Sequence, residues 1–187
     1  MAYDWPVETF VHTEASVRDY FASNAKRRRP LLQTMVSDGQ IIKDTRDLAA
    51  KLKTEAKAQL EQGPPPLTDD EILEQRYFIT DDLDDFIGAK DQTEAFFILS
   101  ELLPGVCDFI FDTRLEWRGG TKWTPRRLQK VDAELYSQLV EGLEAFTRQG
   151  DRMPLIEWVE AVLSPYGGRH FDGFSLGKIK TQSDSTG

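Results

Sequence analysis

Apolar residues recur at helical spacing along most of the chain, and this pattern predicts a mainly helical protein. Side chains three or four positions apart share one face of a helix, so each repeat marks a surface that needs a partner. The predicted helices cover about 13–28, 30–38, 45–62, 68–87, 92–117, 132–148 and 154–163, with a further one starting at Thr124-Pro125. We expect these segments to form an up-and-down helical bundle.

Local signals mark several boundaries in this pattern. Thr68 and Glu71 have the spacing of a capping box, which predicts a helix start at residue 68. Pro104-Gly105 predicts a kink or a division in the long apolar helix. Gly63 and the three prolines at 64–66 form the strongest internal boundary.

The first readable segment has a different period. Residues 6–12 place Val7, Thr9 and Val11 on one side and the residues between them on the other, which is typical of a strand. A strand needs neighbours to satisfy its backbone groups, and the only other extended piece we predict is residues 40–43. We therefore expect a remnant of a sheet, as if the chain were the second half of a two-part protein.

These patterns divide the chain into three regions. Residues 1–44 are predicted to be a sheet remnant with connecting helices, and residues 45–176 a helical bundle domain. The polar residues 177–187 are predicted to form a disordered tail.

Composition narrows the classes of function. The net charge of −9 argues against general nucleic-acid binding, and the basic run at residues 26–29 is interpreted as the solvated end of a helix. The single Cys107 excludes an internal disulfide and, within its apolar stretch, is predicted to be buried. No signal peptide opens the chain and no apolar run is long enough to cross a bilayer, so we expect a cytoplasmic protein.

Two acidic features are candidate sites. Glu8 shares a strand face with Phe10, and a buried carboxylate needs a partner or a metal; the alternative is an exposed, solvated edge. Asp81 and Asp85 lie four apart near the end of a predicted helix, together with Asp82 and Asp84. Like charges at this spacing repel, and the helix dipole disfavours them there. This placement indicates a cation, a basic partner or a proton-accepting role, with a solvated helix end as the alternative.

A cationic segment at residues 117–128 is the third candidate. It holds two tryptophans, two glycines and four cations in a break between helices, and Lys122 and Arg126 are suited to bind phosphate. The alternative is a structural turn whose tryptophans fill the core. A second turn, at residues 165–174, is interpreted as a docking loop for the C-terminus, with His170 structural rather than catalytic.

Several segments together resemble a bacterial family of nucleotidyltransferase-domain proteins, relatives of the aminoglycoside nucleotidyltransferases. The resemblance rests on the order and spacing of WPVETFVHT at 5–13, RPLLQTMVSDGQIIKD at 29–44, residues 63–67, YFITDDLDD at 77–85, residues 117–128 and YGGRHFDGF at 166–174. It implies a polymerase-beta-like α/β domain followed by a helical domain. It also implies magnesium-dependent transfer of a nucleoside monophosphate from a nucleoside triphosphate to a hydroxyl.

The resemblance also implies roles for individual residues. Glu8 falls where the third metal-binding carboxylate belongs, Asp81 or Asp85 would be the general base, and Lys122 would contact the triphosphate. The family's Gly-Ser motif and paired acids are absent from the chain, whose Asp82-x-Asp84 lies in a predicted helix. We therefore expect an N-terminally truncated member that transfers no nucleotide by itself, because one carboxylate does not hold two magnesium ions.

Two other classes of function compete with this interpretation. The chain could be a non-catalytic helical binding or regulatory module, with an exposed strand edge that recruits a partner or a second copy. A helical ribonuclease is disfavoured, because neither His12 nor His170 has an arginine four to six residues upstream.

Overall fold

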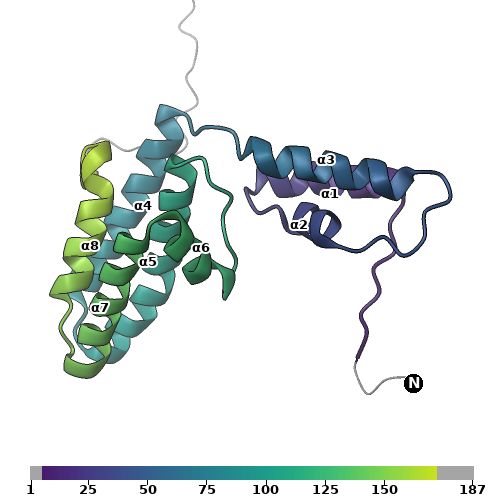
Figure 1. Ribbon diagram of the computed structural model, residues 1–187. Helices are drawn as coiled ribbons and strands as arrows, with labels where there is room; N and C mark the ends of the chain where they lie inside the picture. Colours follow the sequence, from purple (N-terminus) through teal and green to yellow (C-terminus); the bar gives the residue numbers. More distant parts are fainter. Residues whose placement is uncertain (1–5, 172–187) are drawn as a thin grey trace, which may run out of the picture. The chain divides into compact units, whose positions relative to one another are not determined.

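The structure, a computed structural model, describes residues 6–171, and eight α-helices account for most of them (Figure 1). A 3₁₀ turn, Ser164–Tyr166, follows the last helix. The helices are α1 (Glu14–Lys26), α2 (Leu31–Asp38), α3 (Leu48–Gln62), α4 (Asp69–Gly88), α5 (Gln92–Thr113), α6 (Trp123–Val131), α7 (Ala133–Gln149) and α8 (Met153–Leu163). The predicted mainly helical fold is confirmed.

The predicted sheet remnant is not shown. Residues 6–12 have no regular secondary structure and are exposed, and the segment at residues 40–43 is likewise without a strand. Neither segment finds a partner strand within residues 6–171, and a single extended segment satisfies few of its own backbone groups. The period-2 pattern of residues 6–12 therefore does not by itself produce a strand.

The chain divides into two compact units. Of the described residues, the first unit comprises 6–66 and 111–125, and the second comprises 67–110 and 126–171. The structure thus groups α3 with α1 and α2, whereas the sequence had placed residues 45–62 with the later helices. The last residues of α5 and the first residues of α6 belong to the first unit.

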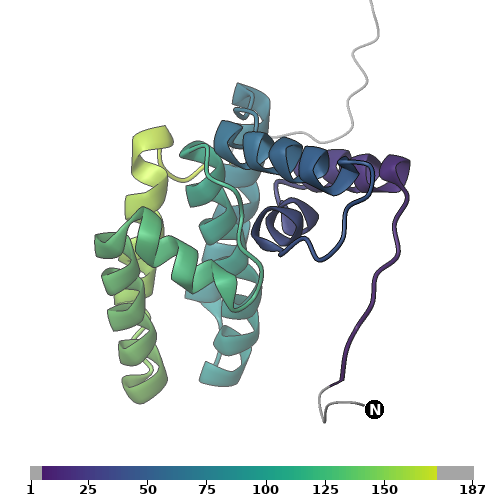
Figure 2. The same cartoon turned by 45° about the vertical axis from the view of Figure 1, so that its right-hand side comes forward.

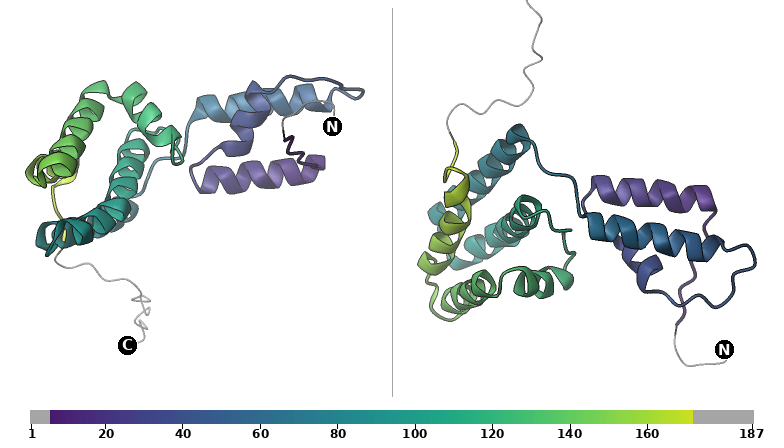
Figure 3. Two further views of the ribbon diagram at one scale, coloured as in Figure 1. Left: turned by 90° about the horizontal axis from the view of Figure 1, so that it is seen from below. Right: turned by 45° about the horizontal axis from the view of Figure 1, so that its top comes forward.

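In the first unit, three helices enclose a small apolar core. The short α2 packs against both α1 and α3, which run alongside each other (Figure 3). The core consists of Val17, Phe21, Leu52 and Ala56, with Leu32, Val36 and Leu48 packed against it. Thr13 and Ser16 form a capping box at the start of α1. The predicted start of this helix is therefore confirmed.

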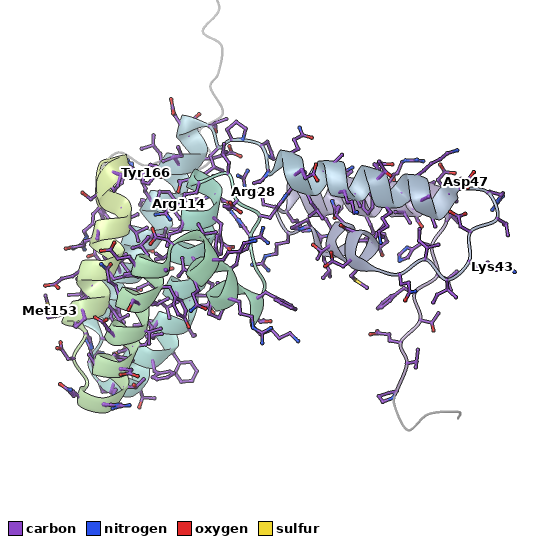
Figure 4. The ribbon with its side chains drawn as sticks, in the orientation of Figure 1. Arg28, Lys43, Asp47, Arg114, Met153 and Tyr166 are labelled. Atoms are coloured by element: carbon purple, nitrogen blue, oxygen red, sulfur yellow. The ribbon has the colours of Figure 1, made fainter. Side chains whose placement is uncertain are left out.

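Buried polar groups complete the first unit. Asp112 is fully buried and accepts hydrogen bonds from Nε of Arg28 (2.7 Å) and Nε of Arg118 (2.8 Å), with a second ion-pair contact from Arg118. Arg28 has a left-handed backbone, φ +57°, and also donates to the Pro65 carbonyl. The Trp117 indole donates to the Leu60 carbonyl (3.0 Å). These contacts join residues 111–118 to the segment just after α1 and to the last turn of α3; Figure 4 labels Arg28.

The second unit is a helical bundle. α4, α5, α7 and α8 run up and down along a common direction, with the shorter α6 between α5 and α7 (Figures 1 and 2). Its core is rich in aromatic rings, and Phe146 contacts both Phe86 (5.6 Å between centroids) and Phe96 (5.8 Å). Gly142 allows α7 and α8 to approach closely, because a Cβ there would lie 2.8 Å from a Leu155 methyl group.

Local predictions in the second unit are mostly confirmed. Thr68 and Glu71 form the predicted capping box, and Asp132 caps α7. Pro104 lies inside α5, which continues past it, so the proline does not divide the helix. α6 begins at Trp123 rather than with Thr124 as its cap. No helix within residues 6–171 combines the length and hydropathy needed to span a membrane.

Candidate functional site

The acidic cluster lies on the last two turns of α4, in the second unit. Asp81, Asp84 and Asp85 are exposed, whereas Asp82 is half-buried. Burial raises the pKa of Asp82, and the neighbouring carboxylates of Asp81, Asp85 and Glu101 raise it further. A carboxylate whose pKa is raised is better suited to accept a proton near neutral pH.

A groove adjoins this cluster, at the junction between α4 and α5. It has a volume of about 540 Å³ and is lined by Asp84, Asp85, Gly88, Ala89, Glu94, Phe97 and Ile98. A shallower hollow of about 310 Å³ continues past Phe97 and Phe96. Phe97 is 75% exposed and Phe96 is 54% exposed, so the floor of this region is aromatic and open to solvent. We call it the α4–α5 groove.

Arg152 holds the α4 end of the groove in place. Its guanidinium donates to the carbonyl groups of Phe86 (3.2 Å), Ala89 (2.9 Å) and Asp91 (3.2 Å), and it lies over the Phe86 ring. A helix end leaves carbonyl groups without intrahelical partners, and a cation there also complements the helix dipole. Arg152 therefore supplies the cap that α4 lacks in its own last turn.

The turn after α8 docks on α4. Arg76 donates to the Gly168 carbonyl (3.0 Å), and the backbone N–H of His170 donates to the Thr80 hydroxyl (2.9 Å). Arg169 forms an ion pair with Asp84, and Phe171 stacks on Tyr77. The predicted docking role of this turn is confirmed for residues 166–171, while residues 172–174 lie outside the described residues. Figure 4 labels Met153 at the start of α8 and Tyr166 in the 3₁₀ turn that follows this helix.

Glu8 lies in the exposed segment before α1, in the first unit, so the solvated alternative describes its position. Within residues 6–171, no three His, Cys, Asp or Glu side chains are grouped so that they could hold a metal ion. The described residues therefore do not fit a two-magnesium site, which needs several converging carboxylates.

The cationic segment at residues 117–128 has a buried part with a structural role and an exposed part. Trp117 is buried and Arg118 contacts Asp112, which matches the structural alternative. Lys122 is exposed and lies 5.6 Å from the ring of Trp123, itself 56% exposed. Gly119 is required at this turn, because a Cβ there would lie 2.7 Å from the backbone of Thr124.

The predicted site residues belong to both units. Glu8 and Lys122 belong to the first unit, whereas Asp81, Asp85 and Arg126 belong to the second. Of the candidates, the structure brings together the acids of α4. It leaves the proposed roles of all five residues as predictions.

Sequence reasoning missed three features of these regions. The basic run at residues 26–29 was interpreted as solvated, but Arg28 is buried against Asp112, and the apolar neighbours of Asp112 were the available signal. The exposure of Phe97 (75%) was not predicted, because the apolar pattern of residues 92–117 does not distinguish an exposed phenylalanine from a buried one. Arg152 gave no signal, since its carbonyl partners are 61–66 residues away in the sequence.

Cys107 is buried, as predicted, and burial raises the pKa of its thiol to about 12. The thiol therefore remains protonated at neutral pH and is a poor nucleophile and metal ligand.

No protein-family model, no curated protein and no solved structure is significantly similar to this chain.

Proposed function

We propose that the chain is a nucleotidyltransferase-family protein whose second unit supplies the acceptor side of the reaction. The observation that supports the proposal is the acidic cluster of α4, in which Asp82 is half-buried and has a raised pKa. Transfer to a hydroxyl needs a group that accepts the hydroxyl proton, and such a carboxylate is suited to that step. We therefore add Asp82 to Asp81 and Asp85 as candidate general bases.

The remaining roles follow the family resemblance. Glu8 would hold magnesium, and Lys122 and Arg126 would contact the triphosphate of the nucleotide. Because the described residues do not form a two-magnesium site, we expect no nucleotide transfer by this chain alone.

The test joins a polymerase-beta-like domain, carrying a Gly-Ser motif and paired acids, ahead of Met1. Magnesium-dependent pyrophosphate release is then measured with a panel of hydroxyl acceptors. We expect turnover in the joined protein and none in the 187-residue chain. Glu8→Gln should abolish turnover, and Lys122→Ala should raise KM for the nucleotide.

The acid cluster is tested in the same joined protein. Replacing the general base should lower kcat by roughly 10²–10⁴ with little change in nucleotide affinity. Asp81→Asn, Asp82→Asn and Asp85→Asn identify which acid it is, and Glu157→Gln, an exposed acid on α8, is the matched control. If all three aspartates can be replaced without loss of kcat, the assignment to α4 is wrong.

A second candidate function is that of a helical binding module. The observation that favours it is the α4–α5 groove, where exposed aromatic rings lie beside acids. Large exposed apolar side chains gathered in one place are typical of interaction sites. Ligand binding at this groove without any turnover would support this function.

A further inference from the structure

We propose that the α4–α5 groove binds a cationic amphipathic helix of a partner protein, which inserts an apolar side chain beside Phe97 and places lysine or arginine against the acidic rim. This inference rests on the binding function proposed above and names the chemistry of the ligand. It involves only residues of the second unit.

Within residues 6–171, no side chain fills the apolar part of the groove. The Phe97 ring is 75% exposed, and Ala89 and Ile98 also line the groove. A Cβ on Gly88 would meet no atom within 4 Å, so the glycine faces empty space rather than a packed neighbour. An aromatic ring beside an unfilled hollow is the kind of feature that receives an anchoring side chain from a partner.

The charge of the groove selects the partner. Among the described residues that line it, Asp84, Asp85 and Glu94 are acidic and none is basic. Asp84 is already paired with Arg169, so the negative charge of the groove comes mainly from Asp85 and Glu94, while Arg152 donates to backbone carbonyl groups. The negative end of the α4 dipole lies at the same place. The neighbouring carboxylates repel one another. A cationic ligand would reduce this repulsion, whereas an anionic ligand would increase it.

The open shape favours a protein segment over a small molecule. Pockets for small molecules enclose most of the ligand surface, whereas here the largest apolar side chain projects into solvent. An amphipathic helix carries apolar anchors at i, i+3, i+4 and i+7 with cations on either side, which matches an aromatic floor with an acidic rim.

The probe is a peptide of about 18 residues, or five helical turns, made of leucine and lysine at amphipathic helical spacing and labelled with fluorescein. Binding to the full chain is measured by fluorescence anisotropy. A leucine–glutamate peptide of the same spacing tests charge, and a serine–lysine peptide tests the need for apolar anchors. We expect binding of the leucine–lysine peptide alone, weakening as salt is raised.

Variants locate the site. Gly88→Leu fills the groove, and Phe97→Ala removes the aromatic floor; each should weaken binding by about tenfold or more. Asp85→Asn should weaken it by a few-fold, because rim charges contribute less. Met153→Ala and Glu157→Gln alter an exposed apolar and an exposed acidic side chain on α8 and should leave binding unchanged. Circular dichroism confirms that each variant is folded, which the exposure of these positions favours.

Each contrary result has a distinct meaning. If the leucine–lysine peptide binds equally well to Gly88→Leu and Phe97→Ala, the groove is not its site and the inference is overturned. If the leucine–glutamate peptide binds and the groove variants abolish that binding, the binding function stands but the cationic partner is wrong. If no peptide binds, the inference is overturned, and the binding function then requires a ligand of another chemical class at the groove. Self-association in sedimentation that Gly88→Leu removes would assign the groove to a second copy of this chain and overturn the inference.

Discussion

The interior of each unit is stabilised by a different kind of contact. Four buried polar or charged residues belong to the first unit, namely Asn24, Arg28, Gln33 and Asp112, whereas the second unit has only Arg76 and Thr80 among the described residues. The second unit instead buries a continuous set of aliphatic and aromatic side chains, including Phe86, Phe109 and Phe146.

This difference reflects how each unit is built. The second unit consists of long amphipathic helices that bury apolar area against one another. The first unit has shorter helices and takes residues 111–125 from far along the chain, so fewer apolar side chains are available to it. Directional hydrogen bonds and ion pairs connect that segment to the rest of the unit, and a buried ion pair adds little net stability because desolvation of the charges offsets their attraction.

Loss of the central carboxylate is expected to have the largest effect on the first unit. Asp112→Ala leaves Arg28 and Arg118 without their shared acceptor and should destabilise the first unit by about 3–5 kcal/mol. Hydrogen exchange followed by mass spectrometry reports the two units separately. Amides of α1–α3 should lose protection while those of α7 and α8 should keep it. Equal loss in both units would contradict the comparison.

The triple variant Arg28→Met, Asp112→Leu, Arg118→Met sharpens this result. Replacing buried ion-paired residues by apolar residues of similar size is often neutral or stabilising by about 1–4 kcal/mol. We expect it to recover most of the stability that Asp112→Ala loses. If it is as unstable as the single variant, the ions stabilise the first unit directly.

A substitution in the aromatic core of the second unit should reduce hydrogen-exchange protection in the second unit rather than in the first. Phe146 is fully buried between Phe86 and Phe96, and Phe146→Ala should cost about 3–5 kcal/mol through lost burial and a cavity. The same exchange measurement should now show loss of protection in α4, α7 and α8. Protection that falls first in α1–α3 would show that the units do not unfold separately.

The cap on α4 should give a smaller effect. Arg152→Ala removes hydrogen bonds to the carbonyl groups of Phe86, Ala89 and Asp91 and should destabilise the second unit by about 1–3 kcal/mol. Arg152→Lys keeps the positive charge but lacks the several N–H donors of the planar guanidinium, so it should retain only part of the stability that Arg152→Ala loses. The urea midpoints of the two variants measure the difference.

A capping carboxylate in the first unit should make its stability depend on acid pH. Asp44 accepts hydrogen bonds from the N–H groups of Arg46, Leu48 and Ala50, and the bond from Ala50 is the main cause of its lowered pKa. A pKa lowered by folding gives stability that is present above the unfolded value, about 4, and is lost as pH falls through the folded value. Asp44→Asn should flatten that acid limb of a plot of thermal midpoint against pH.

Asp82 should show the reverse dependence in the second unit, with the smallest effect. Its pKa is raised by burial and by neighbouring acids, so its charged form destabilises the folded unit at neutral pH. Asp82→Asn should raise the thermal midpoint at pH 7, and the gain should disappear as pH falls below about 4, where the aspartate is protonated in both states. A gain that persists at low pH would arise from another cause.

Local sequence was sufficient to predict most helices and several of their starts. Thr13, Thr68 and Asp132 cap α1, α4 and α7 through hydrogen bonds to residues three positions away, so the information is adjacent in the chain. The start of α3 was less accurate, because Asp44 makes the cap and Asp47 takes a left-handed backbone before Leu48. The strand at residues 6–12 failed because a strand needs partners that a local pattern does not supply.

The sequence by itself determined the helical class, the starts of α1, α4 and α7 and the acidic run of α4, since each depends on neighbours within one or two turns. The burial of Arg28 and the exposure of Phe97 were decided only by the tertiary structure. Arg28 is buried because the fold brings it into contact with Asp112, which is 84 residues away in the sequence. Phe97 is exposed because no segment among the described residues covers that face of α5. Long-range pairing of this kind has no local signature, which is why the groove and the buried ion network emerged only with the fold.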